Sequence, residues 1–117
     1  MNRRRLVIHP GMPKTGTSAL QRFLWENRDT LSRNGWVYPD HVISEADPRH
    51  QFLYTCFYRR RFRALVKCIN ETSGDIILST EGICTHLFGL DEHSPEFLDA
   101  TAGLSVEVVV VHREKTA

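Results

Sequence analysis

The chain has 117 residues, of which 41% are hydrophobic and 25% are charged. Its 15 Lys and Arg residues nearly balance 14 Asp and Glu residues, and this balance argues against nucleic acid as a partner. No apolar run is long enough to span a membrane, and only three apolar residues separate the basic start from His9, so neither a membrane span nor a secretory signal is expected. A cytoplasmic location is the resulting prediction.

The first part of the chain predicts one strand and one long helix. Residues 5–9 have the apolar centre of a buried strand, and residues 17–33 place leucines at helical spacing opposite charged side chains. Asn34-Gly35 is a typical helix end. Residues 36–39 then predict a short extended piece.

The middle of the chain predicts a loop, a broken helix and a second strand. Residues 40–48 are polar and bounded by proline, which favours a loop. Residues 49–72 have a helical pattern with a break near 58–61, and residues 76–80 predict a second strand.

The last part predicts a third strand after a helix. Ser94, Pro95 and Glu96 are typical of a helix start, and Gly103 of a helix end. Residues 106–112 predict a strand whose valine run, 106–111, is typical of a central strand covered on both faces. Strands that alternate with helices predict a single α/β domain over 1–117, a three-layer parallel sheet flanked by helices.

A glycine-bracketed turn lies between the first predicted strand and the first helix. It reads His9-Pro10-Gly11-Met12-Pro13-Lys14-Thr15-Gly16-Thr17-Ser18. A turn at this place directs free backbone N–H groups and the positive end of the helix dipole at one point, where an anion can bind. Lys14 adds a full positive charge, and Thr15, Thr17 and Ser18 add hydroxyl groups. Simple N-capping of the helix is the alternative role for these hydroxyls.

The spacing of the lysine separates this turn from the loop of nucleotide triphosphatases. In that loop the lysine follows the second glycine and a hydroxyl binds magnesium. Here Lys14 lies two residues before Gly16, and no Asp that could bind magnesium is evident after an apolar strand. The turn therefore predicts a phosphate site without a metal and disfavours a small-molecule kinase.

The segment from this turn to Pro39 resembles the start of the bacterial sulfotransferase-like family, which uses 3'-phosphoadenosine-5'-phosphosulfate (PAPS). The matching residues are Lys14-Thr15-Gly16-Thr17-Ser18, Leu20-Gln21, Leu24, Asn27-Arg28, Leu31, Gly35 and Tyr38-Pro39. The resemblance weakens after Asp40 and returns faintly at residues 78–81 and at His112-Arg113. It implies a P-loop-type fold and sulfuryl transfer from PAPS to a hydroxyl group, with a carbohydrate as the favoured acceptor.

The same resemblance implies roles for individual residues. Lys14 would stabilise the leaving oxygen. The cofactor would contact Gly11, Lys14, Thr15, Gly16, Thr17 and Ser18, and Arg113 would bind its 3'-phosphate. The serine that completes that phosphate clamp in the family is missing here.

Three residues compete for the role of proton acceptor. Glu81 is favoured, because it follows an apolar strand at the ligand edge and burial there could raise its pKa; a surface glutamate is the alternative. His9 lies on the turn and is the second catalytic candidate. His50 could reach the site only if the loop before it folds over.

Two further clusters have simple interpretations beside functional ones. Arg59, Arg60, Arg61 and Arg63 are expected to form a solvated helix face, or else a docking patch for an acidic acceptor. Cys56, Cys68 and Cys84 contain no C-x-x-C pair, so reduced thiols are expected rather than a disulfide or zinc site.

The chain is short for a domain of the family it resembles. A valine strand with no helix after it predicts a domain truncated on its carboxyl side, with exposed sheet surface through which copies could associate as a homo-oligomer. An inactive fragment, or a non-catalytic module that binds a nucleotide or phosphate, is therefore the alternative function.

Overall fold

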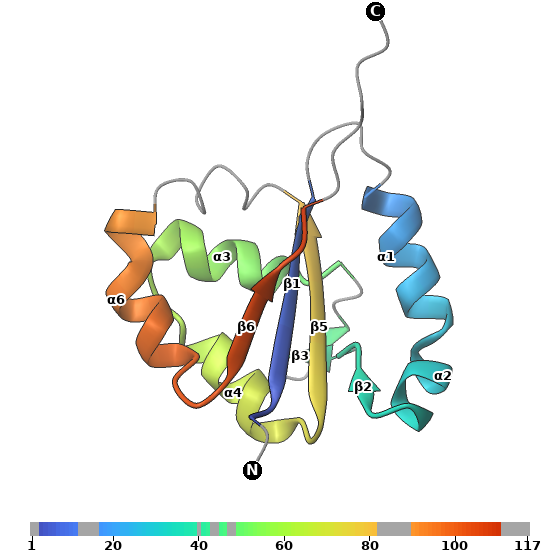
Figure 1. Ribbon diagram of the computed structural model, residues 1–117. Helices are drawn as coiled ribbons and strands as arrows, with labels where there is room; N and C mark the ends of the chain where they lie inside the picture. The colour runs from blue at the N-terminus through green and yellow to red at the C-terminus, as the bar shows by residue number, and fades with distance from the viewer. Residues whose placement is uncertain are drawn as a thin grey trace, which may run out of the picture.

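Four parallel strands form the central sheet of this computed structural model, which describes residues 3–11, 17–39, 41–42, 45–46, 49–81 and 90–110. The strands lie in the order β2-β5-β1-β6 (Figure 1). They are β1 (Arg5–Gly11), β2 (Trp36–Val37), β5 (Asp75–Glu81) and β6 (Ser105–Val108). The predicted α/β class with a parallel sheet is confirmed, and the predicted strand at residues 76–80 lies within β5.

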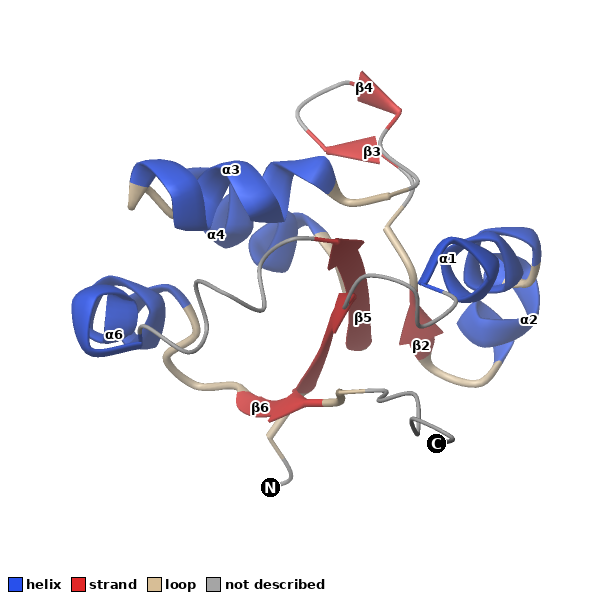
Figure 2. Ribbon diagram, turned by 90° about the horizontal axis from the view of Figure 1, so that it is seen from above, coloured by secondary structure: helices blue, strands red, loops and turns tan. Residues whose placement is uncertain are grey.

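Helices cover both faces of the sheet (Figure 2). One face carries α1 (Thr17–Glu26) and α2 (Arg28–Arg33). The other carries α3 (Gln51–Arg59), α4 (Arg63–Glu71) and α6 (Leu90–Ala100). A small antiparallel pair, β3 (His41–Val42) and β4 (Glu45–Ala46), lies within the segment that was expected to be a loop. No helix in the described ranges is long and apolar enough to cross a membrane.

The main core lies between the sheet and the second group of helices. Alternate residues of the two central strands point into it, and their partners come mostly from α3, α4 and α6. The principal members are Leu6, Ile8, Ile76, Leu78, Leu53, Phe57, Phe62, Leu65 and Phe97. Burial of these side chains is the main stabilising term of the fold. Because strand side chains alternate, His9 and Ser79 lie on the opposite face, toward α1.

The first helix is shorter than expected, because it breaks at Asn27. The side-chain amide of Asn27 donates to the carbonyl oxygen of Phe23 at 2.8 Å, and the guanidinium of Arg28 donates to that of Trp25 at 2.7 Å. The Asn27 backbone N–H also donates to the Phe23 carbonyl oxygen at 3.0 Å, so side chains add to the backbone bonds at the end of α1. The predicted break in the second helical segment is confirmed, since α3 ends at Arg59 and α4 begins at Arg63.

The predicted start of the last helix is wrong. The structure begins α6 at Leu90, so that Pro95 lies inside the helix rather than at its first position. An internal proline lacks the N–H that would bond to the preceding turn. Phe97 of this helix is only 7% exposed and belongs to the core, and such packing can outweigh a local start signal.

The valine strand is also not what its composition predicted. It forms β6, which ends at Val108, pairs with β1 and lies at the edge of the described sheet instead of its centre. Val108, Val109 and Val110 are 47%, 44% and 47% exposed, which agrees with the expected exposed sheet surface at this strand. Sequence composition reports hydrophobicity, whereas coverage depends on which elements pack nearby.

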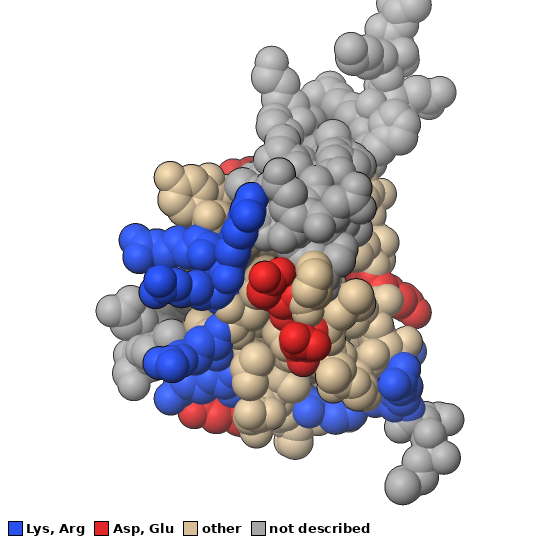
Figure 3. Space-filling model, turned by 90° about the vertical axis from the view of Figure 1, so that its left-hand side faces the viewer, with Lys and Arg blue, Asp and Glu red and all other residues tan. Residues whose placement is uncertain are grey.

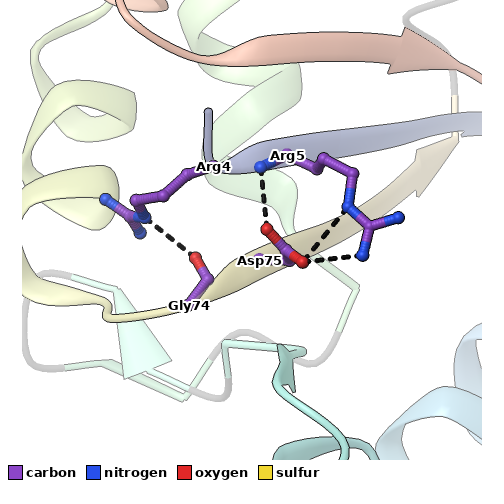
Figure 4. A network of polar contacts seen from close by, with 4 residues as sticks. All are labelled: Arg4, Arg5, Gly74 and Asp75. Carbon is purple, nitrogen blue, oxygen red and sulfur yellow. Dashed lines mark hydrogen bonds and ion pairs between the residues drawn. The ribbon is translucent and has the colours of Figure 1, made fainter. Parts of the chain in front are cut away.

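Two arginines join the start of β1 to the end of α4 and the start of β5 (Figure 4). Arg4 donates to the carbonyl oxygens of Ile69, Thr72 and Gly74, which caps the carboxyl end of α4. Arg5 donates to Asp75 through its backbone N–H at 2.8 Å and its guanidinium at 2.9 Å. These hydrogen bonds hold the pKa of Asp75 below its ordinary value, so its stabilising effect is present above pH 3.8 and is lost under stronger acid.

Two of the three cysteines lie in the described part of the chain and are free and buried. Burial raises the pKa of the Cys56 thiol, and it raises that of Cys68 to about 11. Both therefore stay protonated near neutral pH, which makes them poor nucleophiles. Cys84 lies outside the described residues.

Candidate functional site

The carboxyl ends of β1 and β5 form the edge at which the sequence places the site. The two strands are parallel neighbours, with Gly11 aligned to Glu81 and Pro10 to Thr80. The first turn of α1 begins at Thr17, so the chain passes from strand to helix within five residues. Open parallel sheets bind ligands at this edge, and an adjoining helix start favours anions.

Several predicted site residues lie outside the described part of the structure. These are Lys14, Thr15 and Gly16 of the turn and Arg113. Thr17 and Ser18 are the first two residues of α1, but their side chains are not described. Gly11, His9, Glu81 and His50 are described.

Ser79 is the centre of a buried polar cluster just below this edge. The strand β2 ends at Val37, which pairs with Ile76, so β5 has no strand neighbour beside Ser79 on that side. Two side chains replace the missing strand. Nδ1 of His50 accepts from the Ser79 N–H at 3.0 Å, and the amide nitrogen of Gln21 donates to the Ser79 carbonyl oxygen at 2.9 Å.

The contacts of His50 determine its tautomer. Because Nδ1 accepts from a backbone N–H, the ring proton must be on Nε2, which donates to the carbonyl oxygen of Pro39 at 2.8 Å. The side chain is fully buried, and its ring centroid lies 4.2 Å from that of Tyr38. The backbone of His50 itself is left-handed, with φ of 49°. Both ring nitrogens are thus used for structure, and this geometry disfavours His50 as a proton acceptor.

His9 contacts Ser79 from the neighbouring strand. Its Nδ1 lies 2.8 Å from the Ser79 hydroxyl oxygen, and its side chain is only 4% exposed. Burial lowers the pKa of His9 below its ordinary value of 6.5, so the ring is neutral at physiological pH. His9 lies near the carboxyl end of β1, which precedes the segment that carries Lys14.

Glu81 differs from its expected environment. It is the last residue of β5, as predicted, but it is exposed rather than buried. The buried environment expected for this carboxyl is therefore not found. Its alignment with Gly11 still places it at the edge beside the turn.

Gln21 is the member of the cluster that sequence analysis missed. It is 3% exposed although it is polar, and it lies on α1 three residues before the buried Leu24. Residues spaced by three share one helix face, so a polar residue there signals a buried hydrogen bond. The three-residue spacing between Gln21 and Leu24 is the sequence signal that indicates a buried Gln21.

Thr80 contains a buried hydroxyl that has no hydrogen-bond partner among the described residues. We expect Thr80→Val to raise the free energy of unfolding by about 1 kcal/mol, because valine has nearly the same shape and removes the unpaired group. Thr101→Val is the matched control, since the buried Thr101 hydroxyl donates to the Phe97 carbonyl oxygen at 2.9 Å. The control should lower stability by about 1 kcal/mol in urea unfolding. If both variants change the free energy of unfolding in the same direction, the Thr80 hydroxyl is not an unpaired group.

Acid should destabilise the protein partly through His9. The unfolded chain binds a proton at His9 near pH 6.5, whereas the folded chain resists it, so stability is complete above pH 6.5 and is lost as pH falls toward the lowered pKa. One such group contributes at most about 1.4 kcal/mol per pH unit. We expect His9→Gln to show a shallower loss of unfolding free energy between pH about 6.5 and 5. An unchanged slope would show that His50 or another group dominates.

The basic residues 59–61 and Arg63 all lie at the surface. Figure 3 shows Lys and Arg side chains gathered on the side where α3 and α4 lie, apart from acidic side chains at the centre of that view. The arrangement agrees with an exposed helix face.

A separate open groove of about 580 Å³ runs along α1 and is lined by Ala19, Gln21, Arg22, Phe23, Trp25, Glu26 and Arg49.

Comparisons with known proteins add no relatives to this description. No protein-family model matches the chain, and neither curated proteins nor solved structures give a match. Within the described ranges, no group of three or more His, Cys, Asp or Glu side chains is arranged for a metal ion.

Proposed function

We propose that this chain is a P-loop-type sulfotransferase domain that uses PAPS and a hydroxyl-bearing acceptor, with a carbohydrate as the favoured acceptor. The proposal is supported above all by the position of the turn. Strand β1 ends at Gly11 and helix α1 begins at Thr17, and the residues between them carry Lys14 in the spacing described above. An anion at this place would meet a helix start and a lysine together.

The chemistry of the residues fits a phosphosulfate group. Gly11 brings the backbone close to the ligand edge without a side chain, and the first turn of α1 has no acidic residue that would repel an anion. PAPS would supply the sulfuryl group when bound. Lys14 would hold positive charge at the leaving oxygen, and Arg113 would bind the 3'-phosphate.

Glu81 is the residue that we assign to accept the acceptor's proton. It follows β5 at the same edge as the turn, and its exposed carboxylate can be approached by a substrate hydroxyl. His50 is a weaker candidate, because both of its ring nitrogens bond to backbone groups. Accepting a proton would require breaking its contact with Ser79.

A non-catalytic module that binds a nucleotide or phosphate is the second candidate. It is favoured by the exposure of Glu81, since an exposed glutamate at a strand end need have no catalytic role. The two functions separate in a transfer assay. Sulfuryl transfer from PAPS to a set of sugar acceptors supports the enzyme, whereas tight binding of adenosine 3',5'-bisphosphate without any transfer supports the module.

Removal of metal ions tests whether nucleotide binding needs magnesium. We expect EDTA to leave binding of adenosine 3',5'-bisphosphate unchanged within about 2-fold, because Lys14 and the turn would neutralise the phosphates without magnesium. Isothermal titration with and without added magnesium measures this directly. A magnesium-dependent affinity, with ATP preferred over the bisphosphate, would instead favour a kinase.

A further inference from the structure

The short contact between Ser79 and His9 determines which nitrogen of His9 carries its proton. The Ser79 hydroxyl is fully buried and lies 2.8 Å from Nδ1 of His9. No other acceptor for this hydroxyl is found among the described residues. Leaving a buried O–H group unpaired costs stability, so the hydroxyl donates and Nδ1 accepts.

The ring proton of neutral His9 is therefore on Nε2. This atom has no hydrogen bond to a described residue. His9 is 4% exposed and lies near the carboxyl end of β1. An N–H at this position is free to donate to a ligand.

We propose that Ser79 is a positioning residue that holds His9 in the Nε2–H tautomer, so that His9 donates a neutral hydrogen bond to an oxyanion at the ligand edge. The oxyanion would be a phosphate or sulfuryl oxygen, and its identity rests on the proposed function. His9 is then a binding residue for the anion. The role of proton acceptor is left to Glu81, because Nδ1 of His9 is occupied and Nε2 is already protonated.

The surroundings of His9 are consistent with a neutral ring. The charged groups on the same sheet face include the exposed Glu81 and Glu107 and, toward the start of the strands, the ion pair of Arg5 with Asp75. From α1 the contact to Ser79 is the uncharged Gln21, and from the start of α3 it is His50. Burial lowers the pKa of His9, which keeps the ring neutral as the tautomer argument requires.

Nuclear magnetic resonance of histidine labelled with ¹⁵N tests the tautomer without any ligand. The His9 signals are assigned by their loss in His9→Gln. We expect the parent protein to show His9 as the Nε2–H form and Ser79→Ala to show the Nδ1–H form in addition. Thr80→Val is the matched control, because it removes the neighbouring buried hydroxyl from the opposite face, and it should leave the His9 signals unchanged.

Anion binding tests the donor role. Gln carries an N–H that can replace Nε2–H, whereas Leu cannot donate. We expect His9→Gln to bind sodium sulfate and adenosine 3',5'-bisphosphate within about 3-fold of the parent, and His9→Leu to bind both at least about 10-fold more weakly.

Each result has a definite meaning. An Nδ1–H tautomer in the parent, or an unchanged tautomer in Ser79→Ala, would overturn the positioning role. Equal affinity of the parent and His9→Leu for both anions would overturn the donor role, as would His9→Gln that binds them as weakly as His9→Leu does. Binding of sulfate that weakens in His9→Leu, with no binding of the bisphosphate, would support the donor role and count against the proposed function alone.

Discussion

Replacing Lys14 with alanine will lower sulfuryl transfer by at least about 100-fold, or abolish binding of adenosine 3',5'-bisphosphate. In the proposed reaction, negative charge develops on the bridging oxygen as its bond to sulfur breaks. An ammonium held beside that oxygen stabilises the transition state more than the ground state. Loss of one preorganised donor of this kind costs on the order of 3 kcal/mol, which corresponds to the stated fold-change.

The control for this variant is Lys67→Ala. Lys67 lies on α4, is half-exposed and pairs with Glu71 at 3.2 Å across one helical turn, so it shares the charge of Lys14 but not its place. Titration of the bisphosphate and a transfer assay on both variants separate a local effect from a change in net charge. A Lys14→Ala protein that titrates and turns over like the parent would show that the turn is not the site.

Replacing His50 with phenylalanine will lower the free energy of unfolding by about 3 kcal/mol. Phenylalanine keeps the ring and its packing against Tyr38, but it leaves the Ser79 N–H and the Pro39 carbonyl without their partners. Each buried group that loses its hydrogen bond costs about 1 to 3 kcal/mol. Histidine adopts the left-handed φ of 49° more readily than phenylalanine does, so part of the loss comes from the backbone and adds to that of the hydrogen bonds.

Urea unfolding at neutral pH measures this effect, and Gln21→Leu is the matched control. That variant removes only the contact to the Ser79 carbonyl oxygen, so we expect a loss of about 1 kcal/mol. A graded result, with His50→Phe the less stable of the two, supports side chains that complete the sheet beside Ser79. If His50→Phe unfolds at the urea concentration of the parent, the imidazole does not hold this edge together.

The difference between local and long-range contacts explains where prediction from the sequence succeeded. Hydrophobic periodicity located β1 and β5 and the break between α3 and α4. The expected start of the last helix at Pro95 was wrong, and so was the central place expected for the valine strand, because packing partners decide both.

The α/β class, the strand and the helix on either side of Lys14, and the resemblance on which the proposed function rests all depend on residue types within a few positions of one another, so they could be predicted from the sequence. The meeting of His9, Gln21 and His50 at Ser79, the engagement of both ring nitrogens of His50 and the exposure of Glu81 follow only from the folded structure. The contacts at Ser79 join residues 29 to 70 positions apart. His9 meets Ser79 because β1 and β5 are paired, whereas His50 and Gln21 bond to backbone groups of Ser79 that have no strand neighbour, since β2 ends early.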